Sequence, residues 1–280
     1  MSKILIMLLI VIGILNNISA QSIKVITYNI RYDNPKDGDN RWDNRKDFLT
    51  DQIKFFEPDF WGTQEGLAHQ ISFLDSSLSV YNYIGIGRDD GKKEGEFCAV
   101  FYNSEKFRPI MHSSFWLSET PDVPSKGWDA SLNRICTYGL FEDQATKEKL
   151  WIFNTHFDHR GVEARSNSTK LIIEKIKKLN QKGYPVVFMG DLNLEPENEA
   201  IQYLSNELTD SKTSSKVAFG PSGTYNGFNF NEPVIRRIDY IFVSKGNIDV
   251  LKYAVLSDSK DCRYPSDHLP VYVEIILKKK

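Results

Sequence analysis

Several stretches of this sequence place an acid, an amide or a histidine directly beside a run of apolar residues. The run 186–189 is followed by Gly190, then by Asp191 and, two places later, by Asn193. A polar residue at the end of a strand is most often a turn former or a helix cap, so one such position alone says little about chemistry. The remaining positions of this kind are Asn29, Glu65, His156, Asp239, Asp267 and His268.

Taken together, these residue types indicate a metal-assisted acid–base site. Carboxylate and amide oxygens prefer hard cations, so the set favours Mg²⁺ or Mn²⁺, with Ca²⁺ as a further candidate. Zinc would require more histidine or cysteine ligands than the set supplies. A histidine beside an acid is suited to proton transfer or to binding an anionic oxygen.

The elements that must position these residues are mainly strands. Helical spacing of apolar residues occurs at 44–56 and 162–179, with shorter candidates at 67–74 and 199–204. Many strands with a few helices between them predict a layered α/β domain. We expect 118–133 and 212–231 to be long surface loops. The strand-like apolar runs lie at 23–30, 59–63, 81–87, 97–102, 110–117, 135–141, 150–155, 186–189, 238–243, 250–255 and 271–276.

The first twenty residues differ from the rest of the chain. Residues 1–20 combine Lys3, an uncharged apolar run over 4–15 and a small residue at the end, Ala20. This order predicts a cleaved signal peptide, which leaves 21–280 as one domain and makes the protein secreted or periplasmic. The alternative is an uncleaved membrane anchor, for which the apolar run is short.

Charge and cysteine content narrow the classes further. The net charge is −2, and no basic tract occurs beyond Lys278–Lys280, so charge gives no support for broad polyanion binding. Three cysteines cannot all pair with one another. Cys98 and Cys136 lie in strand-like apolar surroundings, and we predict buried thiols rather than a metal pair.

The motifs, in their order along the chain, closely resemble the endonuclease/exonuclease/phosphatase superfamily. The resemblance implies an α/β fold, a four-layer sandwich of two stacked, mixed but mostly antiparallel sheets flanked by helices. It also implies a site at one end of the sandwich, where loops from both sheets converge. The matching motifs are TYNIR at 27–31, QE at 64–65, GEFCAVFYN at 95–103, NTHFDH at 154–159, GDLN at 190–193, RIDYIFVS at 237–244 and SDHLPV at 266–271.

The resemblance assigns a metal site to three of these positions. Glu65 matches the family's metal-binding glutamate, and Asn29 matches the asparagine that helps to hold the metal's surroundings. Asp267 is expected to add a second carboxylate through water, since Mg²⁺ usually keeps several waters. The implied cofactor is Mg²⁺, with Mn²⁺ or Ca²⁺ as alternatives.

The resemblance also implies roles for the acid–base groups. Asp191 matches the aspartate that orients or deprotonates the attacking water, and Asn193 the residue that orients this water or the phosphate. His268 matches the histidine that binds the phosphate, and Asp239 its paired acid, which favours the imidazolium.

Three further positions carry weaker implied roles. His156 matches a second histidine of the nuclease-like branches, and Glu96 lies where those branches keep an acid partner for it. Arg134 is a candidate phosphate contact.

The chemistry is typical of phosphate ester hydrolysis, which needs charge neutralisation and an aligned water more than a covalent nucleophile. Neither a G-x-S-x-G elbow nor a Walker loop occurs. We predict a divalent-metal-dependent phosphodiesterase or phosphatase whose substrate is a small molecule, a lipid head group or a nucleic acid. The alternatives are a secreted nuclease and, from another class, a catalytically silent binding protein on the same scaffold. No stable protein partner is implied, and we expect a monomer.

Overall fold

Strand β13 (Val271–Leu277) shows how the sequence builds the first sheet. Its residues alternate between buried and half-buried, with Val271, Val273 and Ile275 turned into the core. Strand β8 (Val186–Asp191) is instead buried at every position. A strand that reads as a continuous apolar run must be covered on both faces, and this is the situation of β8 in the centre of the second sheet.

The structure is a computed structural model that describes residues 22–278, and it contains two mixed sheets. The predicted signal peptide, 1–20, lies outside the described residues. In the first sheet β1 pairs in parallel with β2, and β10 with β12, while the other neighbours are antiparallel. The spatial order is β10 (Val217–Phe219), β12 (Ile248–Val255), β13, β1 (Ile23–Asn29), β2 (Phe60–Gln64), β4 (Val100–Asn103) and β3 (Tyr81–Ile84).

The second sheet is antiparallel except between β7 and β8. A main core of aliphatic and aromatic side chains lies between the two sheets, with Val25 and Val273 from the first and Ile152 and Val187 from the second. The spatial order is β5 (Phe107–Trp116), β6 (Ile135–Asp143), β7 (Lys149–His156), β8, β11 (Asp239–Val243) and β9 (Thr209–Asp210).

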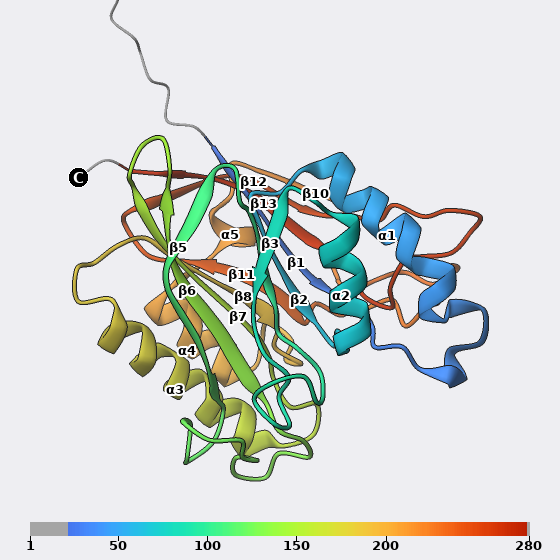
Figure 1. Cartoon of the computed structure of the whole chain (residues 1–280), viewed down its shortest axis with the longest axis horizontal. Helices are drawn as coiled ribbons and strands as arrows, with labels where there is room; N and C mark the ends of the chain where they lie inside the picture. The colour runs from blue at the N-terminus through green and yellow to red at the C-terminus, as the bar shows by residue number, and fades with distance from the viewer. Residues whose placement is uncertain (1–21, 279–280) are drawn as a thin grey trace, which may run out of the picture.

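Helices cover the outer faces of both sheets (Figure 1). On the first sheet lie α1 (Trp42–Phe56) and α2 (Ala68–Ser77), which share an apolar cluster with strands β1 and β2. On the second lie α3 (Val162–Leu179) and α4 (Glu199–Glu207), which pack on β7, β8 and β11. The order helix, sheet, sheet, helix confirms the predicted four-layer sandwich.

Most predicted elements are present, with differences at the edges. Four short elements were not predicted: the 3₁₀ helix η1 (Pro35–Asn40), α5 (Ser211–Ser214), β9 and β10. Of these, α5 and β10 overlap the expected loop 212–231. That loop prediction was therefore wrong in part. Cys98 and Cys136 are buried and free, as predicted. Among residues 22–278, no helix has the length and apolarity needed to cross a bilayer.

Candidate active site

A pocket of about 520 Å³ lies where the ends of strands from both sheets converge. Of the predicted site residues, Asn29 and Asp239 are fully buried beside the pocket and are hydrogen-bonded to residues that line it. The others line it directly: Glu65, Glu96, Arg134, His156, Asp191, Asn193, Asp267 and His268.

Strand register explains why residues distant in sequence meet here. The parallel pair β7–β8 places the last residues of both strands, His156 and Asp191, directly opposite each other. The antiparallel strand β11 begins at Asp239, which is also opposite Asp191. Parallel strands that end at one sheet edge present their terminal side chains to the same space, so the polar ends of apolar runs gather at one site.

Asp191 is the centre of the arrangement and is almost fully buried. Its Oδ1 accepts a hydrogen bond of 2.9 Å from the Asn193 backbone N–H, and its Oδ2 accepts one of 3.0 Å from Asn29 Nδ2. Burial and then the nearby Asp239 raise the pKa of Asp191 to about 7. A carboxyl with this pKa can take up a proton near neutral pH.

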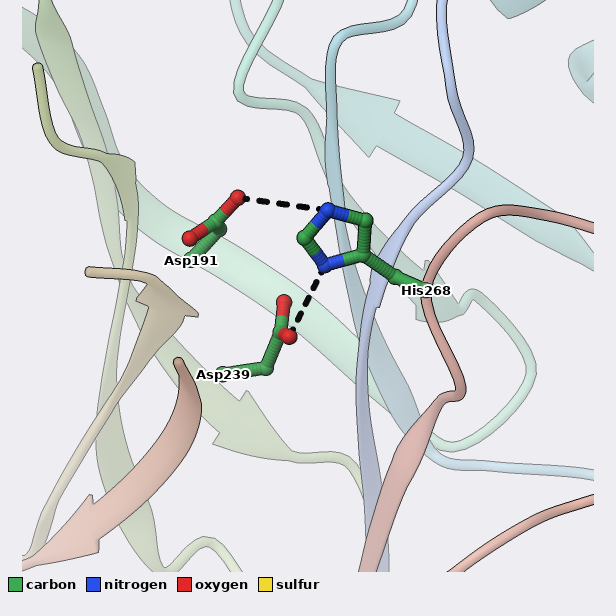
Figure 2. A group of neighbouring side chains, drawn as sticks. All are labelled: Asp191, Asp239 and His268. Atoms are coloured by element: carbon green, nitrogen blue, oxygen red, sulfur yellow. Dashed lines mark hydrogen bonds and ion pairs between the residues drawn. The ribbon is translucent and has the colours of Figure 1, made fainter. Parts of the chain in front are cut away.

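His268 faces Asp191 on one side and Asp239 on the other (Figure 2). Its Nδ1 lies 2.9 Å from Asp239 Oδ2, and its Nε2 lies 3.8 Å from Asp191 Oδ2. Burial alone would lower the pKa of His268, but the two carboxylates raise it well above its usual value. The hydroxyl of Thr224 donates a 2.6 Å bond to the same Asp239 oxygen and so fixes the pair further.

His156 has the opposite charge state. Burial and then the cationic Arg134 and Arg88 lower its pKa well below the usual value, so its ring is neutral. Its Nε2 accepts a 3.1 Å bond from Asn193 Nδ2. The predicted partner Glu96 lies 3.7 Å from His156 Nδ1, beyond hydrogen-bond distance, because two bonds of 2.5 and 2.9 Å engage it with Arg88.

The predicted metal carboxylates share one neighbour. Arg31 Nη1 lies 3.8 Å from Glu65 Oε2 and 3.7 Å from Asp267 Oδ2, so both carboxylates lie close to the same guanidinium nitrogen. Burial raises the pKa of Asp267. The nearby Glu65 raises it further, whereas His268 lowers it. A buried and a half-buried carboxylate on one pocket wall supply oxygen ligands of the kind that a hard divalent cation prefers.

Asn29 links this acid pair to Asp191. Its Nδ2 donates to Glu65 Oε1 at 3.1 Å as well as to Asp191, and its Oδ1 accepts from the Arg31 backbone N–H at 3.0 Å. Asn29 therefore holds the two acids in place. A second set of potential metal ligands is formed by Asp191, Asp239 and His268, whose ligand atoms lie within 4.8 Å of one another.

Three residues of the pocket have an uncommon backbone conformation. Arg31, Glu65 and Asn193 have φ values of 56°, 64° and 50°, in the left-handed region that few residues other than glycine adopt. Each follows closely on the end of a strand, β1, β2 or β8. Such conformations persist where surrounding contacts determine them, and they concentrate at functional sites.

Several pocket residues were not among the predicted site residues. Tyr225 packs edge-on against His268, with ring centroids 5.1 Å apart, and Arg236 lies over the Tyr225 ring. His159 accepts a 3.0 Å bond from Arg134 Nη2. The NTHFDH motif already contained His159, but Tyr225 lies in a stretch without periodicity, and only its bridges to 236 and 268 bring it here.

Fold and site together define a class of hydrolases that act on phosphate esters. Residues 26–268 match the endonuclease/exonuclease/phosphatase family, so the chain belongs to this family. Its members hydrolyse phosphate esters and use divalent metals, in agreement with the buried acidic and histidine cluster.

Individual relatives agree with this assignment. A family member from Bacteroides thetaiotaomicron is 39% identical, with 92% of this chain and 99% of that chain covered and a TM-score of 0.89. A mannosyl-6-phosphatase from B. thetaiotaomicron is also 39% identical, with 91% and 99% covered and a TM-score of 0.87. An uncharacterized protein of Acanthamoeba polyphaga mimivirus is 30% identical over 163 residues, 55% of this chain, and covers only 60% of that relative's length.

Proposed function

We propose that this protein is a divalent-metal-dependent hydrolase of phosphate esters, with Mg²⁺ or Mn²⁺ as cofactor and a small polar leaving group. The observation that carries the proposal is the environment of Asp191, a buried acid between the charged His268 and the neutral His156. Two histidines, one charged and one neutral, beside a single carboxyl are typical of a site in which one group acts as the acid and another as the base.

The geometry supports a direct attack by water. Asp191 takes a proton from the water as its oxygen bonds to phosphorus, while the bond from phosphorus to the leaving oxygen breaks. The imidazolium of His268, held by Asp239, donates to a phosphoryl oxygen and stabilises the charge that develops there. Asn193, fixed by His156, orients the water. The second proton of the water stays on the oxygen that is now bonded to phosphorus. The leaving oxygen takes up a proton from solvent to become the alcohol, and Asp191 releases the proton it accepted to solvent.

The metal site is assigned to Glu65 and Asp267, with Asn29 behind them. When bound, the divalent cation neutralises charge on the phosphoryl oxygens. The ligand set fits such a cation because both residues line the pocket and carry hard oxygen donors.

Two observations support a small polar leaving group. The pocket has few apolar side chains in its wall, chiefly Leu132 and Ile238 with two tyrosines, so a lipid tail would find little apolar surface. The similarity to a mannosyl-6-phosphatase covers nearly the whole of both chains.

The test is a substrate panel in one buffer: sugar phosphates, p-nitrophenyl phosphate, bis-p-nitrophenyl phosphate, phospholipid head groups and single-stranded DNA. We expect metal-dependent release of phosphate from small esters, abolished by EDTA and by Asp191→Asn. Rapid DNA cleavage that weakens steeply with salt would instead favour the nuclease. Binding of the esters without turnover of any of them would favour the silent binding protein.

A further inference from the structure

Arg31 is anchored outside the pocket and presents one nitrogen to it. Its Nε and Nη2 donate to the two oxygens of Asp37 at 2.9 and 3.0 Å, a bidentate pair. The remaining Nη1 faces Glu65 and Asp267 at distances too long for a hydrogen bond. An oxygen atom bound beside these carboxylates therefore lies within reach of an unused guanidinium donor.

Arg134 is arranged in the same way from another wall. It is 3% exposed; its Nε donates to Asp158 at 3.3 Å, and its Nη2 is bonded to His159. Among residues 22–278, its buried Nη1 has no hydrogen-bond partner. A buried donor without a partner is costly, so its presence in a pocket wall indicates a ligand that completes it.

Asp158 makes the position of Arg134 rigid. Besides that arginine, its carboxylate accepts backbone N–H bonds from Leu132, Arg160 and Gly161 at 3.3, 2.9 and 2.8 Å. One acid thus ties the end of the long loop, the start of β6 and the turn after β7 together. The guanidinium is placed before any ligand arrives, which lowers the entropic cost of binding.

The two arginines supply more hydrogen-bond donors and positive charge than a phosphodiester requires. A phosphodiester has one charge on two non-bridging oxygens, and His268 together with a cation at Glu65 and Asp267 would neutralise that charge. A monoester has three such oxygens and, above its second pKa of about 6, a charge close to −2. We infer that Arg31 and Arg134 bind the additional oxygen and charge of a terminal phosphoryl group, so that this enzyme selects phosphomonoesters over phosphodiesters. This inference rests on the function proposed above.

The experiment compares two esters with the same leaving group, p-nitrophenyl phosphate and bis-p-nitrophenyl phosphate. We expect the wild-type protein to prefer the monoester in kcat/KM, and Arg31→Gln to lower this preference by about tenfold or more, the size of a lost charged hydrogen bond. Arg134→Lys should act in the same direction. Arg108→Gln is the matched control, because it removes an exposed guanidinium on β5, outside the pocket.

A second readout does not depend on turnover. Binding of inorganic phosphate, measured by calorimetry with Mg²⁺ present, should weaken about tenfold in Arg31→Gln, while Mn²⁺ binding followed by electron paramagnetic resonance stays close to the wild-type value. Thermal unfolding shows whether each variant is folded; if Arg31→Gln is not, Arg31→Lys is compared instead.

Several results would overturn the inference. These are a wild-type preference for the diester, an equal loss on both esters, or unchanged phosphate binding with weakened Mn²⁺ binding, which would mean that Arg31 serves the metal carboxylates alone. Failure of the wild-type protein to hydrolyse either ester would instead contradict the proposed function.

Discussion

Replacing Asp239 by asparagine tests the central pair of the site. The carboxylate of Asp239 accepts from His268 Nδ1 at 2.9 Å and from the Thr224 hydroxyl at 2.6 Å, and it is 1% exposed. Asparagine keeps the shape, and its amide oxygen can still accept both of these bonds, which are weaker without the charge. It removes the negative charge that raises the pKa of His268, and burial then lowers that pKa.

The expected loss follows from the charge state of His268. A group with a raised pKa is protonated below that pKa, so the imidazolium is present in the wild-type protein at neutral pH and is lost in Asp239→Asn. Loss of one preorganised donor to a developing oxyanion costs about 3–4 kcal/mol, or about 10²–10³ in kcat. The charged hydrogen bond itself contributes about 1.5–3 kcal/mol to folding, so stability should fall by a similar amount.

The assay is the pH dependence of kcat between pH 5 and 9. In Asp239→Asn the alkaline limb should move to lower pH, because the pKa of His268 falls, and activity should recover in part on acidification. Asp249→Asn, which changes a half-exposed acid paired with Lys278, is the matched control and should leave the profile unchanged. An unshifted alkaline limb in Asp239→Asn would refute the assignment of the charged state to His268.

Three other predictions concern separate parts of the molecule. Burial raises the pKa of Asp158, but backbone N–H groups and Arg134 hold it at about 2, so its contribution of about 2 kcal/mol is present above pH 4 and is lost towards pH 2. The free energy of unfolding of Asp158→Asn, measured in urea, should therefore be about 2 kcal/mol lower than that of the wild type at pH 7, and it should change less between pH 4 and pH 2. Equal free energies of unfolding at pH 7 would contradict this prediction. In Gly190→Ala the new Cβ would overlap the Thr155 carbonyl oxygen, which should cost about 3 kcal/mol or more, whereas Gly246→Ala, with open space around it, should cost about 1 kcal/mol. Asp267→Asn should raise the Mg²⁺ concentration for half-maximal rate about tenfold or more, measured after EDTA treatment and titration; an unchanged requirement would exclude this residue from the metal site.

The sequence predicted the centre of the fold because the central strands have strong patterns. β8 is buried on both faces, so its apolar run and its polar end at Asp191 were visible without a structure. β10 is exposed at every residue and belongs to the sheet only through its pairing with β12, so no pattern marks it. α5 has four residues, too few for helical periodicity.

The same contrast holds for the site. His268 and Asp239 were paired through motifs, and the structure places them 2.9 Å apart, although their catalytic roles stay predictions. Glu96 lies 3.7 Å from His156 as well, but its two hydrogen bonds to Arg88, in the loop that follows β3, were not predicted. Such a contact depends on tertiary folding of a loop, which local sequence does not encode strongly.

The left-handed backbone at Arg31, Glu65 and Asn193 has a consequence for engineering. This conformation costs about 1–2 kcal/mol at arginine and at glutamate, less at asparagine and almost nothing at glycine. Glycine at 31 or 65 would relieve this strain, but it would also remove the ion pair of Arg31 with Asp37 or the bond from Asn29 to Glu65, each of about the same size. Stabilising substitutions in this protein should therefore be sought away from these three positions, where the strain and the side chain that the pocket uses come together.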